Sequence, residues 1–437
     1  MRASKGTLMS PVSELPIALR KARAGISLLV RFLRRGRTRI SNLLRKKWRH
    51  YSKRAAWYWK WMRERVRNGR TTVVNFAGAG LRRLRVLHKP FVRLFRRSRR
   101  INELLTLRRQ EWHVERQIRR VVRSDVPLVL GPWLSEVGFE VLYWLPFLRW
   151  LKTEYGWDPA SAVAISRGGV ASWYHGLADH YVEIFEYVDL HTFVRRNSIR
   201  REAADGSQKQ LHSSDFDHEL IQFACERAGF SRHRVVHPSA MYKLFRQFWL
   251  GHRPISHVQE RTRFADLTPC STFDLSGLPK DYVAVKLYTA QSLPDSARNR
   301  RVLHALIEQL SEVASIVILD TGIAVDDHTD YGFDRHDRVF HLGEMMRPQN
   351  NLELQTQVIA GAKEFVGTCG SLAWLAPMIG VPTVALFSDA RFLRTHLYFA
   401  RHAYSAMGAA RFATLDVSAH EGLGFETVMQ VMPTGVQ

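Results

Sequence analysis

Residues 364–387 read EFVGTCGSLAWLAPMIGVPTVALF, and no other stretch of the chain indicates its fold class so clearly. The apolar run over 364–366 predicts a strand, and the glycine-rich residues 367–371 predict a tight turn. A helix is expected over 372–378, followed by a second strand over 381–387. Two buried strands joined through a helix form a parallel βαβ unit with a right-handed crossover.

The same alternation of strands and helices continues outward from this unit. Before it we expect strands over 282–288, 315–320 and 339–342 and helices over 297–313 and 352–362. Still earlier we expect a strand over 127–131, a helix over 138–155, a strand over 162–166, an apolar run over 182–190, a helix near 216–228 and an apolar segment over 241–250.

A polar, proline-containing link over 251–279 divides this pattern in two. The expected fold class is therefore α/β, with two doubly wound Rossmann-like domains at 126–265 and 266–437 and a cleft between the carboxyl ends of their strands. The composition, with 46% hydrophobic and 11% aromatic residues, excludes a chain that is disordered throughout.

The basic charge of the chain is concentrated at its N-terminal end. The 437 residues have a formal net charge of +25, but residues 1–130 alone contain 36 Lys and Arg against 6 Asp and Glu. This is a net charge of +30, which leaves −5 for residues 131–437. Leucines at helical spacing and a cluster of Trp and Tyr over 57–61 lie among the arginines.

Residues 1–125 are accordingly expected to form a basic amphipathic helical arm that binds an anionic membrane surface. Packing on the body or on a partner, and binding of nucleic acid, stay open as alternatives. The three cysteines include no C-x-x-C pair, which favours a reducing compartment. With no apolar run of about 18 residues, the expected location is cytoplasmic, peripheral on the cytosolic face of a membrane.

The body resembles GT-B glycosyltransferases, nearest to the heptosyltransferase-like and fucosyltransferase-like groups. The likeness in the donor half is carried by residues 282–286, 316–322 and 365–387. The loop over 131–140 resembles the first βα turn of surface-glycan transferases, and the likeness covers about 126–437. It implies that the C-terminal domain binds a nucleotide sugar and that the N-terminal domain faces a glycan or lipid-linked acceptor.

Such a transfer requires groups that stabilise the departing diphosphate. The turn residues expected to do so, through backbone amides and hydroxyls, are Gly367, Thr368, Gly370 and Ser371. The alternative for Ser371 is that it merely caps the helix that follows.

Three further residues are candidates for donor binding, each with a structural alternative. Lys286 lies near the end of a strand and could contact a phosphate or form a salt bridge. Arg298 could supply a second cation or lie on a solvated helix face. Asn350 precedes a helix, where related enzymes approach the base or ribose, but capping is an equal explanation.

Glu136, in the loop after the first strand, is the predicted general base for the acceptor hydroxyl, and Glu140 is the next candidate or an acceptor ligand. No metal and no other cofactor is expected, because Asp215-Phe-Asp217 is predicted to open a helix instead of ending a strand. A nucleotide-sugar epimerase and a nucleic-acid-binding protein with a non-catalytic body are the competing functions.

Overall fold

The computed structural model describes residues 105–123, 125–203, 209–267, 269, 272–323, 325, 328–408 and 411–419. Most of the predicted arm, including the aromatic cluster at 57–61, lies outside the described residues. The body belongs to a compact unit that begins at Asn102. Within the described residues, no helix combines the length and the apolar character needed to cross a bilayer.

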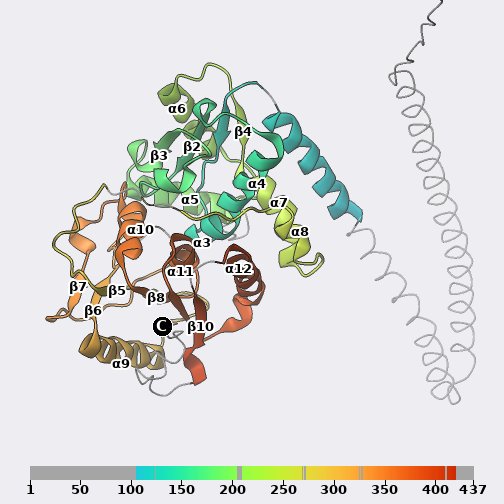
Figure 1. Ribbon diagram of the computed structural model, residues 1–437. Helices are drawn as coiled ribbons and strands as arrows, with labels where there is room; N and C mark the ends of the chain where they lie inside the picture. The colour runs from blue at the N-terminus through green and yellow to red at the C-terminus, as the bar shows by residue number, and fades with distance from the viewer. Residues whose placement is uncertain are drawn as a thin grey trace, which may run out of the picture. The chain divides into compact units, whose positions relative to one another are not determined.

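The first half of the body is a parallel sheet with the strand order β3-β2-β1-β4 (Figure 1). Its strands are β1 (Leu128–Leu130), β2 (Ala162–Ser166), β3 (His180–Glu183) and β4 (Arg234–Val236). Its helices are α3 (Val137–Phe139), α4 (Leu145–Tyr155), α5 (Leu190–Ala203), α6 (Asp215–Ala228), α7 (Pro238–Trp249) and α8 (Ser256–Gln259). A π-helical turn, Glu140–Trp144, joins α3 to α4, so the predicted helix over 138–155 is interrupted near its start.

The second half is a six-stranded parallel sheet with the order β10-β9-β8-β5-β6-β7. Its strands are β5 (Tyr282–Lys286), β6 (Ser315–Ile318), β7 (Val339–His341), β8 (Glu364–Thr368), β9 (Thr383–Phe387) and β10 (Phe412–Asp416). Its helices are α9 (Ala297–Val313), α10 (Asn351–Gly361), α11 (Ser371–Leu375) and α12 (Arg394–Met407). Because β5 and β8 are neighbours and the chain winds away from both, their carboxyl ends form a topological switch point.

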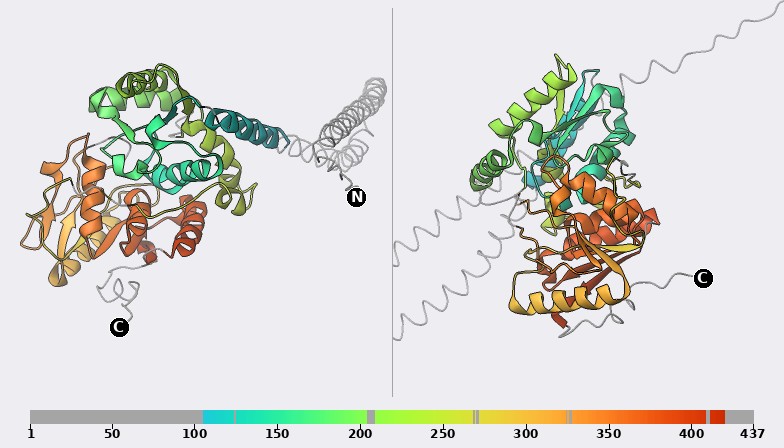
Figure 2. Two further views of the ribbon diagram at one scale, coloured as in Figure 1. Left: turned by 45° about the horizontal axis from the view of Figure 1, so that its top comes forward. Right: turned by 90° about the vertical axis from the view of Figure 1, so that its left-hand side faces the viewer.

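Successive residues of the central strands point to opposite faces of their sheet and pack in different hydrophobic cores. Helices therefore cover both faces of each sheet, and both halves are doubly wound. Leu128 and Leu130 pack in the core that contains α4 and α7, whereas Val129 packs against α6. In the second sheet, Val283 and Val285 face α9, which covers the opposite face from α10 and α11 (Figure 2). The expected fold class is therefore confirmed, with the strands generally shorter than predicted.

Five of the described helices and strands escaped prediction: β4, α5, α8, α12 and β10. The apolar run over 182–190 is only partly a strand, since β3 ends at Glu183 and a short 3₁₀ turn follows. α5, which begins within that run at Leu190, carries as many charged as apolar residues, and no apolar period marks it in the sequence.

The two halves share one hydrophobic core and are fastened to each other by backbone and side-chain contacts. The carbonyl of Gly168, after β2, accepts hydrogen bonds from the amides of Leu352 (3.0 Å) and Glu353 (2.9 Å) at the start of α10. On the other side of the body, the ring of Phe399 on α12 stacks on Tyr143, with 5.1 Å between centroids and 6° between planes. Besides the chain link between the sheets, the two halves are thus joined by these two contacts.

A helix over 105–122 also packs on the first half, which corrects the predicted boundary of the arm at residue 125. Ile118 and Val122 are buried in the shared core. Glu111 and Glu115 form ion pairs with Arg253 and Arg261. The last part of the predicted arm therefore belongs to the body, because one side of it supplies apolar contacts and paired charges.

Candidate functional site

A cleft of about 750 Å³ opens at the carboxyl ends of β1, β5 and β8. Loops that follow these three strands line it, together with the first turn of α12. From the first half come residues 136–139 with Leu142, Tyr143 and Lys209; from the second half come residues 288–292, Pro294, Asp295, His328, 369–371, Trp374, Phe392, Leu393 and His396. This is the position at which open parallel α/β sheets bind ligands.

The two sides of the cleft touch where Gly138 meets the turn after β8. A Cβ atom added to Gly138 would lie 2.9 Å from the amide nitrogen of Ser371, closer than real Cβ contacts come. Only glycine at position 138 therefore allows the Glu136 loop to lie against this turn.

The turn itself has an unusual backbone conformation. Gly370 has φ = 140° and precedes α11, and Ser371 has φ = 37°, a region that L-residues rarely adopt. The N-cap position belongs to Gly370, without a side-chain cap, so the alternative that Ser371 caps the helix is wrong. Because α11 has only five residues, it has no long helix dipole to attract an anion. The groups that this turn offers to an anion are its own backbone amides and the Ser371 hydroxyl.

Glu136 lies half-buried on the cleft wall, and Lys209 lines the same cleft near it. Burial lowers the pKa of Lys209, while the nearby carboxylate of Glu136 acts to raise it. The ammonium of Lys209 lies 5.4 Å from the ring centroid of Phe139 and 4.9 Å from that of Trp249. No sequence motif marks Lys209, because it lies 73 positions from Glu136 and is brought there by the fold.

A hydrogen-bonded Tyr143–His396 pair forms another part of the wall. The Tyr143 hydroxyl lies 2.7 Å from Nδ1 of His396, and both residues line the cleft. Burial, with a smaller effect of Lys209, lowers the pKa of His396 to about 4. The imidazole is therefore neutral at pH 7. No motif marks this pair, since 253 positions separate its members.

Glu140 is not part of the cleft lining and lies in the core of the first half. One carboxylate oxygen accepts hydrogen bonds from Ser166 (2.6 Å) and from Tyr174 (2.6 Å). The other oxygen is buried and has no hydrogen-bond partner among the described residues. Burial raises the pKa of Glu140 to about 7, while the nearby Arg167 acts to lower it.

Two of the four predicted turn residues serve the core instead of the cleft. Thr368 is 1% exposed, and its hydroxyl donates to the carbonyl of Tyr288 and accepts from the amide of the same residue, both at 2.9 Å. A Cβ on Gly367 would meet the ring of Phe365 at 2.6 Å. Both residues join β8 to its neighbours and so hold the cleft-lining turn in position.

The three other donor-binding candidates also lie outside the cleft lining. Lys286 forms an ion pair with Asp330 at 2.8 Å, so it has the salt bridge that was named as the alternative to phosphate contact. Arg298, in the first turn of α9, donates to the carbonyl of Ser418 at 2.6 Å. Asn350 occupies the N-cap position of α10, where the Gly168 carbonyl already accepts the first amides.

The loop after β5 supplies polar groups that sequence reasoning missed. Thr289, Gln291 and Ser292 line the cleft opposite the Glu136 loop. The signal was available, since a polar run directly follows a buried strand at the centre of the second sheet. It was overlooked because the strand was expected to extend to residue 288, two residues beyond its actual end at Lys286.

Asp217 is a structural residue, as its sequence context predicted. It forms a capping box with Ser214 at the start of α6 and lies 2.9 Å from Nε2 of His237. Among the described residues, no group of three or more His, Cys, Asp or Glu side chains is arranged to bind a metal ion.

No family model matches the chain, and no curated protein matches it either. Solved structures that are similar to it include the glycosyl transferase family 9 protein from Veillonella parvula, with 13% identity over 60% of this chain and 81% of that chain and a TM-score of 0.35. E. coli ADP-heptose LPS heptosyltransferase II has 13% identity, coverage of 61% and 86%, and a TM-score of 0.35.

A UDP-GlcNAc 2-epimerase from Methanocaldococcus jannaschii shows 12% identity, coverage of 71% and 93%, and a TM-score of 0.28. The resemblance stated from the sequence agrees with the first two of these similarities.

Proposed function

We propose that the chain is a glycosyltransferase that moves a hexosyl, heptosyl or fucosyl-type sugar from a nucleotide donor to a glycan or membrane-associated acceptor. The observation that carries this proposal is the contact between the Glu136 loop and the Gly370–Ser371 turn across one cleft. This contact supports a site in which a carboxylate of the first half faces the turn proposed to bind the diphosphate in the second half.

The reaction needs one group for each of these positions. The acceptor hydroxyl attacks the anomeric carbon, the bond from that carbon to the diphosphate oxygen breaks, and a base takes the hydroxyl proton. Glu136 is the proposed base. The amides and hydroxyl of the Gly370–Ser371 turn are the proposed partners of the departing diphosphate, with the polar loop over 289–292 on the donor side.

The proposed donor set is accordingly smaller than the one expected from the sequence. Lys286, Arg298 and Asn350 do not line the cleft and are not included; Lys286 and Arg298 are paired with Asp330 and the Ser418 carbonyl. Glu140 is omitted as a base because its carboxyl group is buried in the core. The reaction is proposed to need neither a metal ion nor another cofactor. It is proposed to take place in the cytoplasm, a reducing compartment in which the three cysteines, an odd number, stay reduced.

Ligand binding is the first test, with the full-length protein. Thermal unfolding is followed with UDP, GDP, ADP and CMP, since a ligand that binds the folded state raises the melting temperature. We expect one nucleoside diphosphate to stabilise the protein more than the other nucleotides. No stabilisation by any of them would contradict a donor site.

Turnover of Glu136→Gln is the second test. The nearly isosteric change removes the base, so turnover falls by roughly two to four orders of magnitude while donor binding is kept. The matched control is Glu226→Gln, an exposed glutamate on α6 outside the cleft. Equal activity of both variants would remove Glu136 from the mechanism, and an epimerised nucleotide sugar formed without acceptor would favour the epimerase.

A further inference from the structure

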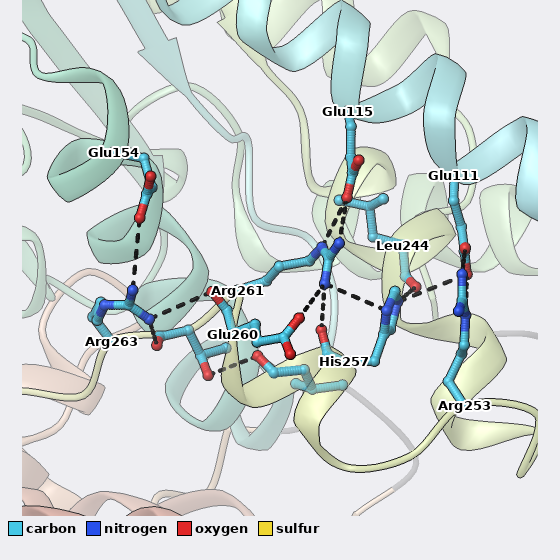
Figure 3. Close-up of polar contacts among 11 residues, drawn as sticks. Glu111, Glu115, Glu154, Leu244, Arg253, His257, Glu260, Arg261 and Arg263 are labelled. Carbon is cyan, nitrogen blue, oxygen red and sulfur yellow. Dashed lines mark hydrogen bonds and ion pairs between the residues drawn. The ribbon is translucent and has the colours of Figure 1, made fainter.

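The helix over 105–122 segregates its charges between its two sides. Its two acidic residues, Glu111 and Glu115, point into the body and pair with Arg253 and Arg261 (Figure 3). His257 lies between these pairs, and its Nε2 is 3.0 Å from the carbonyl of Leu244. The negative charge of the helix is therefore neutralised at the interface with α7 and α8.

The outward side carries arginine without any acidic residue. Six exposed arginines lie on it or directly after it: Arg108, Arg109, Arg116, Arg119, Arg120 and Arg123. At 3.6 residues per turn these side chains fall within an arc of about 120°. The buried residues Glu111, Ile118 and Val122 fall on the opposite side. We call this arginine-rich side of residues 105–123 the outer helix face.

Two large apolar side chains lie within the same arc. Trp112 is 54% exposed and Leu105 is 49% exposed. By helical spacing both fall near the middle of the outer helix face, with arginines on either side of them. Exposed apolar residues framed by guanidinium groups are typical of helices that lie on a lipid headgroup layer.

We propose that the outer helix face docks on an anionic phospholipid surface. Its six positive charges complement the acidic headgroups, and Trp112 and Leu105 enter the boundary between headgroups and acyl chains. Nucleic acid fits less well, because the guanidinium of Arg116 lies 5.3 Å from the ring centroid of Trp112 and covers a face that a base would use for stacking. Leu105 offers no stacking surface at all.

Arg119 differs from its neighbours and is left out of the test. It lines a groove of about 300 Å³ with Glu154 and Glu260, which offset part of its charge. The informative positions are Arg109, Arg116 and Arg120, since no ion pair to a described residue is found for them.

The experiment measures partitioning of the full-length protein onto vesicles of phosphatidylcholine and phosphatidylserine in equal parts. The test variant is Arg109→Gln/Arg116→Gln/Arg120→Gln. Each arginine at an anionic surface strengthens partitioning by about fivefold, so losing three predicts a decrease of about 100-fold. The control, Arg232→Gln/Arg234→Gln/Arg301→Gln, changes the net charge equally at exposed positions outside the outer helix face, and we expect it to decrease partitioning much less.

Trp112→Ala provides a second, charge-neutral variant, which we expect to lower partitioning by about tenfold or less through lost burial of one aromatic side chain. Equal partitioning of the test and control variants would overturn the proposal, because residues outside the outer helix face would then hold the protein on the vesicles. So would a loss of single-stranded RNA binding in the test variant with unchanged vesicle binding. None of these results depends on the proposed transferase activity.

Discussion

Replacing Glu140 by Gln should change how the stability of the protein depends on pH. In the folded protein burial raises the pKa of this carboxyl group to about 7, against an ordinary value of 4.5. Between these two pH values the folded state keeps the proton and the unfolded state releases it. The contribution of Glu140 to the free energy of unfolding therefore falls as pH rises through this window and levels off above it.

The size of this effect follows from the two pKa values. Their difference corresponds to about 3 kcal/mol, which the wild type loses between about pH 4 and pH 8 and which the Gln variant does not lose. Relative to wild type, Glu140→Gln should thus gain about 3 kcal/mol over this range. The new amide keeps the oxygen that accepts from Ser166 and Tyr174, and any fixed cost of burying its NH₂ group is the same at each pH.

Urea unfolding of both proteins at several pH values measures this difference directly. Glu183, whose pKa burial also raises to about 7, is present in both proteins, so its contribution largely cancels. A difference between the two proteins that stays constant with pH would refute the reasoning. It would mean that the Glu140 carboxyl group is ionised in the folded state and therefore reaches water or a cation.

Ser371→Ala should weaken binding of a nucleoside diphosphate by about 1.5 to 3 kcal/mol and leave nucleoside binding nearly unchanged, because one hydrogen bond to a charged group is lost. Calorimetric titration with both ligands measures this difference. Equal losses of affinity for the two ligands would show that the turn does not bind phosphate. Gly370 is unsuitable for this test, since at φ = 140° any side chain strains the backbone whether or not a ligand binds. The pKa of His396, about 4 in the folded protein against 6.5, predicts that the contribution of this residue to stability falls by up to about 3 kcal/mol as pH falls from about 6.5 to 4, because the unfolded state gains a proton there. His396→Gln should remove this acid sensitivity in urea unfolding, and an unchanged acid limb would show that the imidazole is protonated in the folded protein.

Local sequence pattern was sufficient for the elements whose burial is regular. β2 at Ala162–Ser166 and α9 at Ala297–Val313 have their predicted bounds, because β2 is mostly a continuous apolar run and α9 repeats buried apolar residues at helical spacing from Val302 to Leu310. β10 and α12 were missed, since β10 is only partly buried and α12 begins inside a run of charged and aromatic residues. The spacing of apolar residues reflects how much of an element is buried, so it predicts partly buried elements poorly.

The candidate site divides in the same way. Glu136 and the Gly370–Ser371 turn could be predicted because each follows a buried strand, and the carboxyl ends of parallel strands are where loops meet. Lys286 and Glu140 were placed at the site by the same rule and are not there, since the rule gives the end of a strand but not the direction in which one side chain points. Lys286 turns to Asp330, and Glu140 turns into the core.

The sequence by itself determined the two-sheet α/β architecture and the uneven distribution of charge, because both follow from properties that each residue has locally. The tertiary structure alone decided the contact of Gly138 with Ser371, the meeting of Lys209 with Glu136, and the Tyr143–His396 hydrogen bond. It also decided that helix 105–122 turns its acids inward and its arginines outward. These are distances between residues far apart in the chain, and they are set by how two sheets and their covering helices pack into one core, a property that no single segment carries.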